Sequence, residues 1–319
     1  MLAAAGSAYY FLVYQPAHTL PVEIGYVLPP TVQVVDTPAE VRLAVGTLKS
    51  GDRVEITKRT RNWAQIRTAD IATGWVENKN LLDSQAYEGG QKLLRDLTRT
   101  PPQAEGHTSG TVNLRLEPSR DAIQLAQLQE NLKLQVYGRR MIERPAAEGQ
   151  STAAKVRDAW YEVRSQDSAG WVLGRFVALD PPEQLSPYAQ GSNLVAWLVL
   201  KKVNDEGQAM PEYLTADRLG TQDADFSHIR VFTWWVKDHK YVTAYVEGNL
   251  KGYFPIRVMQ NSDIPYFRLR LMDDDGRKYQ KVYGLFDTIT RSVGTVPGWE
   301  SDEMPSAAEA RRHRRATKH

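Results

Sequence analysis

The chain has 319 residues, of which 42% are hydrophobic, and this is enough for a sizeable core divided over two or three domains. Its formal net charge is only +2, so no overall field draws it to nucleic acid, and we expect no nucleic-acid partner. It contains no cysteine, which excludes disulfides, zinc–thiolate sites and thiol nucleophiles, including the nucleophile of a cysteine peptidase.

Residues 1–22 begin with an apolar segment from Met1 to Tyr14. The segment is too short to span a bilayer, and it lacks the basic start of an export signal. It resembles the distal half of a signal or membrane anchor, and a strand or helix packed on the first domain is the alternative. The favoured interpretation predicts membrane association and a location in the cell envelope, periplasmic or extracellular.

Two segments of the chain share a pattern of short apolar strands. In each, a Gly-Trp-Val triplet, at 74–76 or 170–172, follows a Trp-x-x-[Ile/Val]-Arg strand that begins at Trp63 or Trp160. Apolar residues alternate within each strand, which is typical of a half-buried antiparallel sheet. We therefore expect two small β-barrels, at residues 23–83 and 108–180.

The order of these motifs resembles the bacterial SH3 (SH3b) family. The first copy matches at Gly46, Leu48, Gly51, Asp52, Val54, Trp63, Ile66, Gly74, Trp75 and Val76. The second matches at Val112, Asn113, Leu114, Arg115, Pro118, Trp160, Val163, Gly170, Trp171 and Val172. The first copy departs at its start, where Val32-Gln33-Val34 and Thr37-Pro38 replace Asn-Leu-Arg and Gly-Pro. The resemblance implies modules that bind a peptidoglycan peptide or glycan, or a protein partner.

Two roles are expected for the tryptophans of these segments. Trp75 and Trp171 stand between Gly and Val, and indole rings in so small a barrel are usually part of the core. Trp63 and Trp160 begin the preceding strand, where the resemblance implies a position near the family's ligand groove. The candidate ligand-binding residues are therefore Trp63, Trp160 and the adjacent Tyr161, with core packing as the alternative.

The connections between these parts are also visible in the sequence. Residues 84–107 are expected to be a helical segment and a linker. Leucines at helical spacing predict a helix from Ser84, Pro101-Pro102 ends it, and a polar linker follows from Gln103. Residues 139–158 are a polar insertion at a hairpin tip, which we interpret as a tolerated insertion rather than a specificity loop.

Residues 190–299 are expected to form a third, β-rich domain of no recognised family. Strands are predicted at 194–200, 230–236, 241–247, 253–259, 266–272 and 278–286. Asp274-Asp275-Gly276 predicts a hairpin turn, and the polar stretch 204–227 predicts a short helix or lid around Tyr213 to Leu219. Residues 300–319 are expected to be a disordered basic tail.

No motif of a catalytic, phosphate-binding or metal site is present in the sequence. His228 lies near Asp223 and Asp225, but three such residues in a loop serve solvation or capping more often than metal binding. We expect a mainly β protein with two tandem SH3-like barrels and a β-meander or barrel-like domain. The predicted function is non-enzymatic envelope binding or scaffolding without a cofactor, metal or catalytic residue. The alternative is an enzyme with an unrecognised active site in the third domain.

Overall fold

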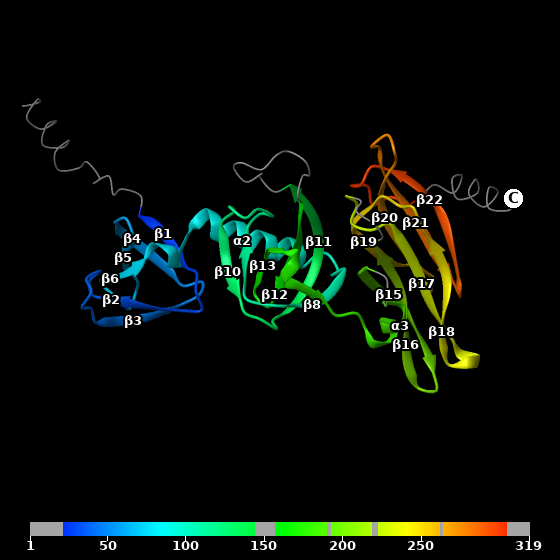
Figure 1. Cartoon of the computed structure of the whole chain (residues 1–319), viewed down its shortest axis with the longest axis horizontal. Helices are drawn as coiled ribbons and strands as arrows, with labels where there is room; N and C mark the ends of the chain where they lie inside the picture. The colour runs from blue at the N-terminus through cyan, green and yellow to red at the C-terminus, as the bar shows by residue number, and fades with distance from the viewer. Residues whose placement is uncertain (1–21, 144–156, 190–192, 219–222, 262–263, 305–319) are drawn as a thin grey trace, which may run out of the picture. The chain divides into compact units, whose positions relative to one another are not determined.

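The computed structural model describes residues 22–143, 157–189, 193–218, 223–261 and 264–304. The chain forms two compact units, and the first ends at Gly89 (Figure 1). The predicted anchor before residue 22, the tip of the insertion and the tail beyond residue 304 lie outside the described residues. None of the described helices is long and apolar enough to cross a membrane.

The first unit contains a seven-stranded antiparallel sheet that surrounds one small core. Its strand order is β3-β2-β6-β5-β4-β1-β7. Alternate residues of each strand are buried, as period-two patterning predicts, and they include Val34, Val54 and Ile66. The elements are β1 (Glu23–Val27), β2 (Thr31–Val35), β3 (Ala44–Lys49), β4 (Arg53–Arg59), β5 (Trp63–Arg67), β6 (Gly74–Glu77), the 3₁₀ helix η1 (Asn78–Asn80) and β7 (Leu81–Asp83).

The second unit begins with another seven-stranded sheet, of the order β10-β9-β13-β12-β11-β8-β14. Its seven strands, taken in chain order, are arranged as those of the first sheet are, so the two sheets have the same topology. Trp75 lies opposite Gln65, and Trp171 lies opposite Glu162. The two Gly-Trp-Val triplets therefore occupy the same place in the two sheets. The elements are β8 (Ala104–Thr108), β9 (Val112–Arg115), β10 (Gln124–Leu128), β11 (Lys133–Glu143), β12 (Arg157–Ser165), β13 (Ser168–Leu173), η2 (Gly174–Phe176) and β14 (Val177–Leu179).

Helix α2 (Ser84–Leu97) lies where the sequence predicts a helix. The Asp83 carboxylate accepts a hydrogen bond from the Ala86 amide at 2.7 Å, which caps its first turn. The polar linker predicted after the helix is wrong, because Ala104–Thr108 form strand β8, which pairs with β11 and β14. Both ends of the insertion predicted at 139–158 also belong to strands. Strand β11 continues to Glu143, and its partner β12 begins at Arg157.

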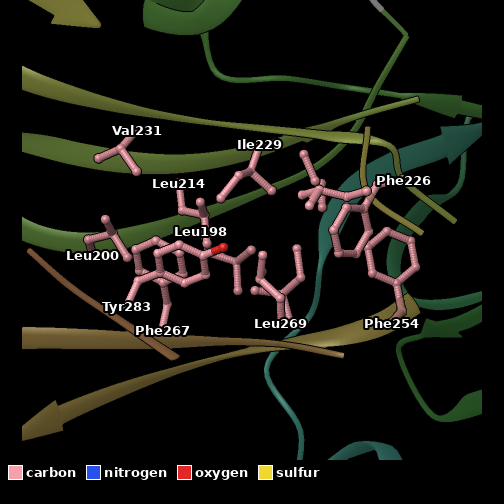
Figure 2. Packing of buried hydrophobic residues seen from close by; sticks show 14 of the residues in the cluster. Leu198, Leu200, Leu214, Phe226, Ile229, Val231, Phe254, Phe267, Leu269 and Tyr283 are labelled. Carbon is pink, nitrogen blue, oxygen red and sulfur yellow. The ribbon is translucent and has the colours of Figure 1, made fainter. Parts of the chain in front are cut away.

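The third domain consists of two four-stranded antiparallel meanders. Figure 2 shows side chains of one sheet, including Leu200, Leu214 and Val231, facing Phe267 and Tyr283 of the other. The meander prediction is confirmed, and the space between the sheets is filled by side chains. The elements are η3 (Glu183–Leu185), α3 (Ser186–Ala189), β15 (Leu194–Asp205), β16 (Gln208–Asp217), β17 (His228–Trp235), η4 (Val236–Asp238), β18 (Lys240–Glu247), β19 (Gly252–Asn261), β20 (Ile264–Met272), β21 (Lys278–Phe286) and β22 (Ile289–Pro297).

The helix or lid predicted around Tyr213 is wrong, because this stretch lies in β16. A tight turn joins β15 to β16, and its two central residues, Glu206 and Gly207, have φ values of 49° and 86°. Positive φ at both positions matches the twist of a two-residue hairpin loop. The turn predicted at residues 274–276 is present, and Gly276 has a φ of 78°.

The second sheet and the third domain share one core within the second unit. Trp197, Tyr213 and Phe232 of the third domain pack in the same cluster as Leu114 and Val136 of the second sheet. The two parts are therefore one packed body rather than separate domains joined by a linker.

Gln103, predicted to begin a linker, joins the two parts. Its side chain is fully buried, and its amide donates to the Ile256 carbonyl at 3.1 Å and accepts from the Ile256 amide at 2.7 Å. Its own carbonyl accepts from the Trp197 amide at 2.9 Å. A polar residue at the start of a predicted linker thus satisfies buried main-chain groups of β19.

Replacing Gln103 with alanine should lower the free energy of unfolding of the second unit by about 1–3 kcal/mol, because the Ile256 amide and carbonyl lose their partners. Chemical denaturation of the full chain measures the change. The exposed Gln127 of β10 provides the control, and Gln127→Ala should leave the curve unchanged. Equal denaturation curves for Gln103→Ala and wild type would show that the two hydrogen bonds with Ile256 do not stabilise the second unit.

Candidate functional site

An open surface pocket of about 480 Å³ lies at one end of the first sheet. It is lined by Arg61, Asn62, Trp63, Glu77, Asn78 and Lys79, from the β4–β5 turn and from the end of β6 into η1. Asn78 fixes the turn, because its side-chain amide donates to the Thr60 carbonyl at 2.9 Å and its main-chain amide donates to the Asn62 carbonyl at 2.8 Å. The pocket wall is thus held by hydrogen bonds from Asn78 to main-chain carbonyls of the turn.

Trp63 supplies the aromatic surface of this pocket. Its ring is half-buried, and the Arg42 guanidinium lies 5.1 Å from the ring centroid. Glu77 stands opposite Trp63 across the strand pair and forms an ion pair with Lys79. The pocket therefore places an indole beside groups of both charge signs, which suits a small ligand with a flat or apolar face and a polar or charged end.

A strip of exposed aliphatic residues adjoins Arg42. Val41, Leu43 and Val45 are 89%, 71% and 45% exposed, and they alternate along the segment that enters β3. Among the described strands, β3 pairs only with β2, so it is an edge of the sheet. Sequence reasoning missed this strip, although the alternation of Val41, Leu43 and Val45 with Arg42 was its signal.

Trp160, the counterpart of Trp63, has different surroundings. It is 3% exposed and packs against Trp171 and Leu173, with Ile142 and Phe176 beside them. Leu173 occupies the position opposite Trp160 that Glu77 occupies opposite Trp63. An apolar partner in place of a charged one closes this end of the second sheet, so Trp160 offers no free ring face for stacking.

Tyr161 is half-buried and packs at the margin of the shared core of the second unit. Burial lowers the pKa of the Arg139 guanidinium, and the neighbouring Tyr161 phenol acts in the opposite direction. The structure therefore does not bring the three predicted ligand residues together. Trp63 lines the pocket of the first unit, whereas Trp160 and Tyr161 belong to the packing of the second.

Acidic and histidine side chains of the third domain form small closed groups. His239 Nδ1 lies 2.7 Å from Asp205 Oδ2, which also accepts from the Trp234 indole at 2.7 Å. The hydrogen bond with Asp205 raises the pKa of His239, and the same bond lowers the pKa of Asp205. His228 contacts Ser227 at 3.1 Å. Within the described residues, no group of three His, Asp or Glu side chains could hold a metal ion.

Comparison with known proteins gives one family match. The family model of the bacterial SH3 domain matches residues 44–81, a range that contains β3 to β6, Trp63 and the pocket. No curated protein matches the sequence.

Three solved structures are similar only at low scores. NlpC2 from Trichomonas vaginalis is 9% identical over 72% of this chain and 97% of that chain, with a TM-score of 0.18. NlpC1 from the same organism is 11% identical over 87% and 93%, also with 0.18. An NlpC/P60 family protein from Bacillus cereus is 9% identical over 84% and 98%, with 0.22. Scores this low carry no argument about the present chain. The family match covers residues 44–81 and the strands that this segment forms, and by it the first unit contains a bacterial SH3 domain.

Proposed function

We propose that the protein is a non-enzymatic binding or scaffolding protein of the cell envelope, and that its first barrel binds a cell-wall peptide or glycan at the Trp63 pocket. The proposal rests on one observation: the matched SH3 segment contains an open pocket with a half-exposed indole and charged side chains of both signs. Exposed aromatic rings are enriched among the residues that dominate binding energies.

The pocket chemistry favours short ligands with polar ends. The indole of Trp63 can stack on a sugar ring or a peptide plane, and Arg61 and Lys79 can each donate to a carboxylate. Glu77 can accept from hydroxyl or ammonium groups. The aliphatic strip next to Arg42 would bind an apolar part of the same ligand or of a protein partner.

We further propose that the second sheet is another SH3-like barrel that has lost this pocket. Its strand order and its tryptophan positions agree with those of the first. Leu173 and Gly174 stand where Glu77 and Asn78 line the first pocket, and Trp160 is buried. In this proposal the second barrel supports the third domain through their shared core, and ligand binding falls to the first barrel alone.

Replacing Trp63 with alanine should weaken binding to peptidoglycan fragments by about 2 kcal/mol, or roughly 30-fold in Kd, because the stacking surface is lost. The melting temperature should change little, since the ring is only half-buried. Titration of purified fragments into the full-length variant measures the affinity, and a thermal melt of the same variant measures its melting temperature.

Trp235→Ala is the matched control, because that indole is 40% exposed and lies in the third domain. Equal affinities for wild type and Trp63→Ala would refute the pocket as the ligand site. Cleavage of the purified peptidoglycan fragments during the titration would favour the enzyme alternative instead.

A further inference from the structure

Three arginines gather on the outer face of the second sheet of the third domain. Arg257 of β19 lies opposite Arg268 of β20, and Arg270 follows two residues along the same strand. Phe267, Leu269 and Leu271 of β20 point into the core, so the alternating arginines point to the other side. We call Arg257, Arg268 and Arg270 the arginine face.

The segment after β22 lies across this face. Arg268 donates to the main-chain carbonyls of Ser301, Asp302 and Glu303, the last two at 3.1 and 2.9 Å. Gln280 adds a bond to the Ser301 carbonyl at 2.8 Å. The tail predicted from residue 300 is therefore bound to the sheet at its start. Arg268 thus binds main-chain carbonyls of the segment and not its side chains.

The side chains of the segment complement the charge of the face. Asp302 lies 2.6 Å from the Arg257 guanidinium, and Glu300 lies 3.9 Å from that of Arg270. Glu300 and Asp302 are two residues apart, and their carboxylates lie beside two different arginines of this face. Burial lowers the pKa of Arg268 and Arg270, and the neighbouring Arg257 charge lowers both further. The crowded guanidinium groups thus favour an anionic cover.

Beyond Trp299, the carboxylates of the segment are weakly held, whereas its main-chain carbonyls bond to Arg268 and Gln280. The Trp299 indole donates to the Leu271 carbonyl at 2.9 Å and packs in a tilted arrangement against Tyr253, with ring centroids 4.9 Å apart, so it anchors the start of the segment. Beyond it, the side chains of Glu300 and Asp302 are 90% and 80% exposed, and exposed ion pairs contribute little. Arg268 is 2% exposed, and its Nε atom has no hydrogen-bond partner among the described residues. A buried donor, Arg268, therefore lies beneath a segment whose side-chain contacts are weak.

We propose that the arginine face is a binding site for an extended acidic peptide, and that residues 300–303 occupy it as an internal ligand that such a peptide can displace. Such a peptide would accept hydrogen bonds from Arg268 through its main-chain carbonyls. Two of its carboxylates, two residues apart, would pair with Arg257 and Arg270. The internal segment competes at high effective concentration, so the intact chain binds an external peptide weakly.

The test uses the full-length chain and a fluorescent peptide with the sequence of residues 298–304. Glu300→Gln with Asp302→Asn removes the carboxylates of the internal ligand but keeps its carbonyl contacts, so the peptide should bind severalfold more tightly than to wild type. Adding Arg257→Ala and Arg270→Ala to this variant should abolish that gain. Arg277→Ala in the same background is the control, because Arg277 lies in an exposed turn and pairs with Asp273.

A second measurement reads the displacement directly. Excess unlabelled peptide should lower the anisotropy of a fluorophore attached at Met304→Cys, the single cysteine of that variant, and a peptide with lysine at its acidic positions should not. Unchanged affinity across wild type and both variants would overturn the proposal. Equal binding of the lysine peptide, or of polyphosphate in its place, would overturn the peptide specificity. Melting curves establish that the variants are folded, and Arg268 is left intact because it is buried.

Discussion

Replacing Trp171 with alanine is expected to lower the free energy of unfolding of the second unit by about 3–5 kcal/mol. The ring is 5% exposed, packs against Trp160 and Leu173, and lies 5.0 Å from the Arg140 guanidinium. Truncation removes this buried area and leaves a cavity that the neighbours fill only in part. Because domain stabilities are themselves only about 5–15 kcal/mol, the loss should be plain in chemical denaturation of the full chain.

Trp75 provides the internal comparison, because it holds the same strand position in the first unit and is only half-buried. Trp75→Ala should cost less than Trp171→Ala. Amide exchange resolved by segment assigns each loss, with faster exchange within 23–83 for the first variant and within 104–179 for the second. A loss below about 1 kcal/mol for Trp171→Ala would mean that the ring does not support the core.

The strand arrangement of the two sheets could be anticipated from the sequence, but the exposure of their tryptophans could not. Alternation and the Gly-Trp-Val triplets predict strands and place Trp63 and Trp160 alike. Whether either ring is open depends on the residue across the strand, Glu77 in one sheet and Leu173 in the other. That pairing is known only once the register is fixed.

Polar residues caused the larger errors. β16 was missed because Glu212, Thr215 and Asp217 are buried within it and interrupt the apolar alternation. The Asp217 carboxylate accepts a bidentate hydrogen bond from the Arg230 guanidinium of the next strand, at 2.8 and 2.7 Å. Gln103 was read as linker for the same reason, and its partner Ile256 is 153 residues away. A local sequence pattern predicts that polar residues are exposed. A polar residue can instead be buried when a partner far away in the sequence satisfies its hydrogen bonds.

The two proposed sites differ in what they would bind. The Trp63 pocket offers an aromatic surface with mixed charge, whereas the arginine face offers cations and a backbone donor. They also lie in different compact units. A chain with both would connect a cell-wall ligand to an acidic peptide of a partner, which is a scaffolding role that needs no catalytic residue.

Asp225 should give the second unit a stability that falls as the pH rises. The side chain is 6% exposed, accepts from the Phe254 amide at 3.0 Å and lies 3.7 Å from the buried Arg139 guanidinium. Burial raises the pKa of Asp225 from its ordinary 3.8 to about 6, although the Phe254 bond and Arg139 act in the opposite direction. Between these two values the folded state holds a proton that the unfolded chain has lost, so stability declines from about pH 4 to about pH 6 and is level above.

A shift from 3.8 to about 6 corresponds to about 3 kcal/mol, and Asp225→Asn should remove this contribution because the amide stays neutral while its oxygen can still accept from Phe254. Denaturation of both proteins from pH 4 to 7 isolates it as a difference, with wild type losing ground to the variant as the pH rises. Glu247 supplies a control of opposite sign: although burial opposes them, hydrogen bonds from Lys281, Tyr245 and Tyr283 lower its pKa. Wild type should therefore lose stability relative to Glu247→Gln only as the pH falls. Parallel curves for wild type and Asp225→Asn would show that the Asp225 carboxyl titrates alike in the folded and unfolded chains, and that the guanidinium of Arg139 and the Phe254 amide compensate its burial in full.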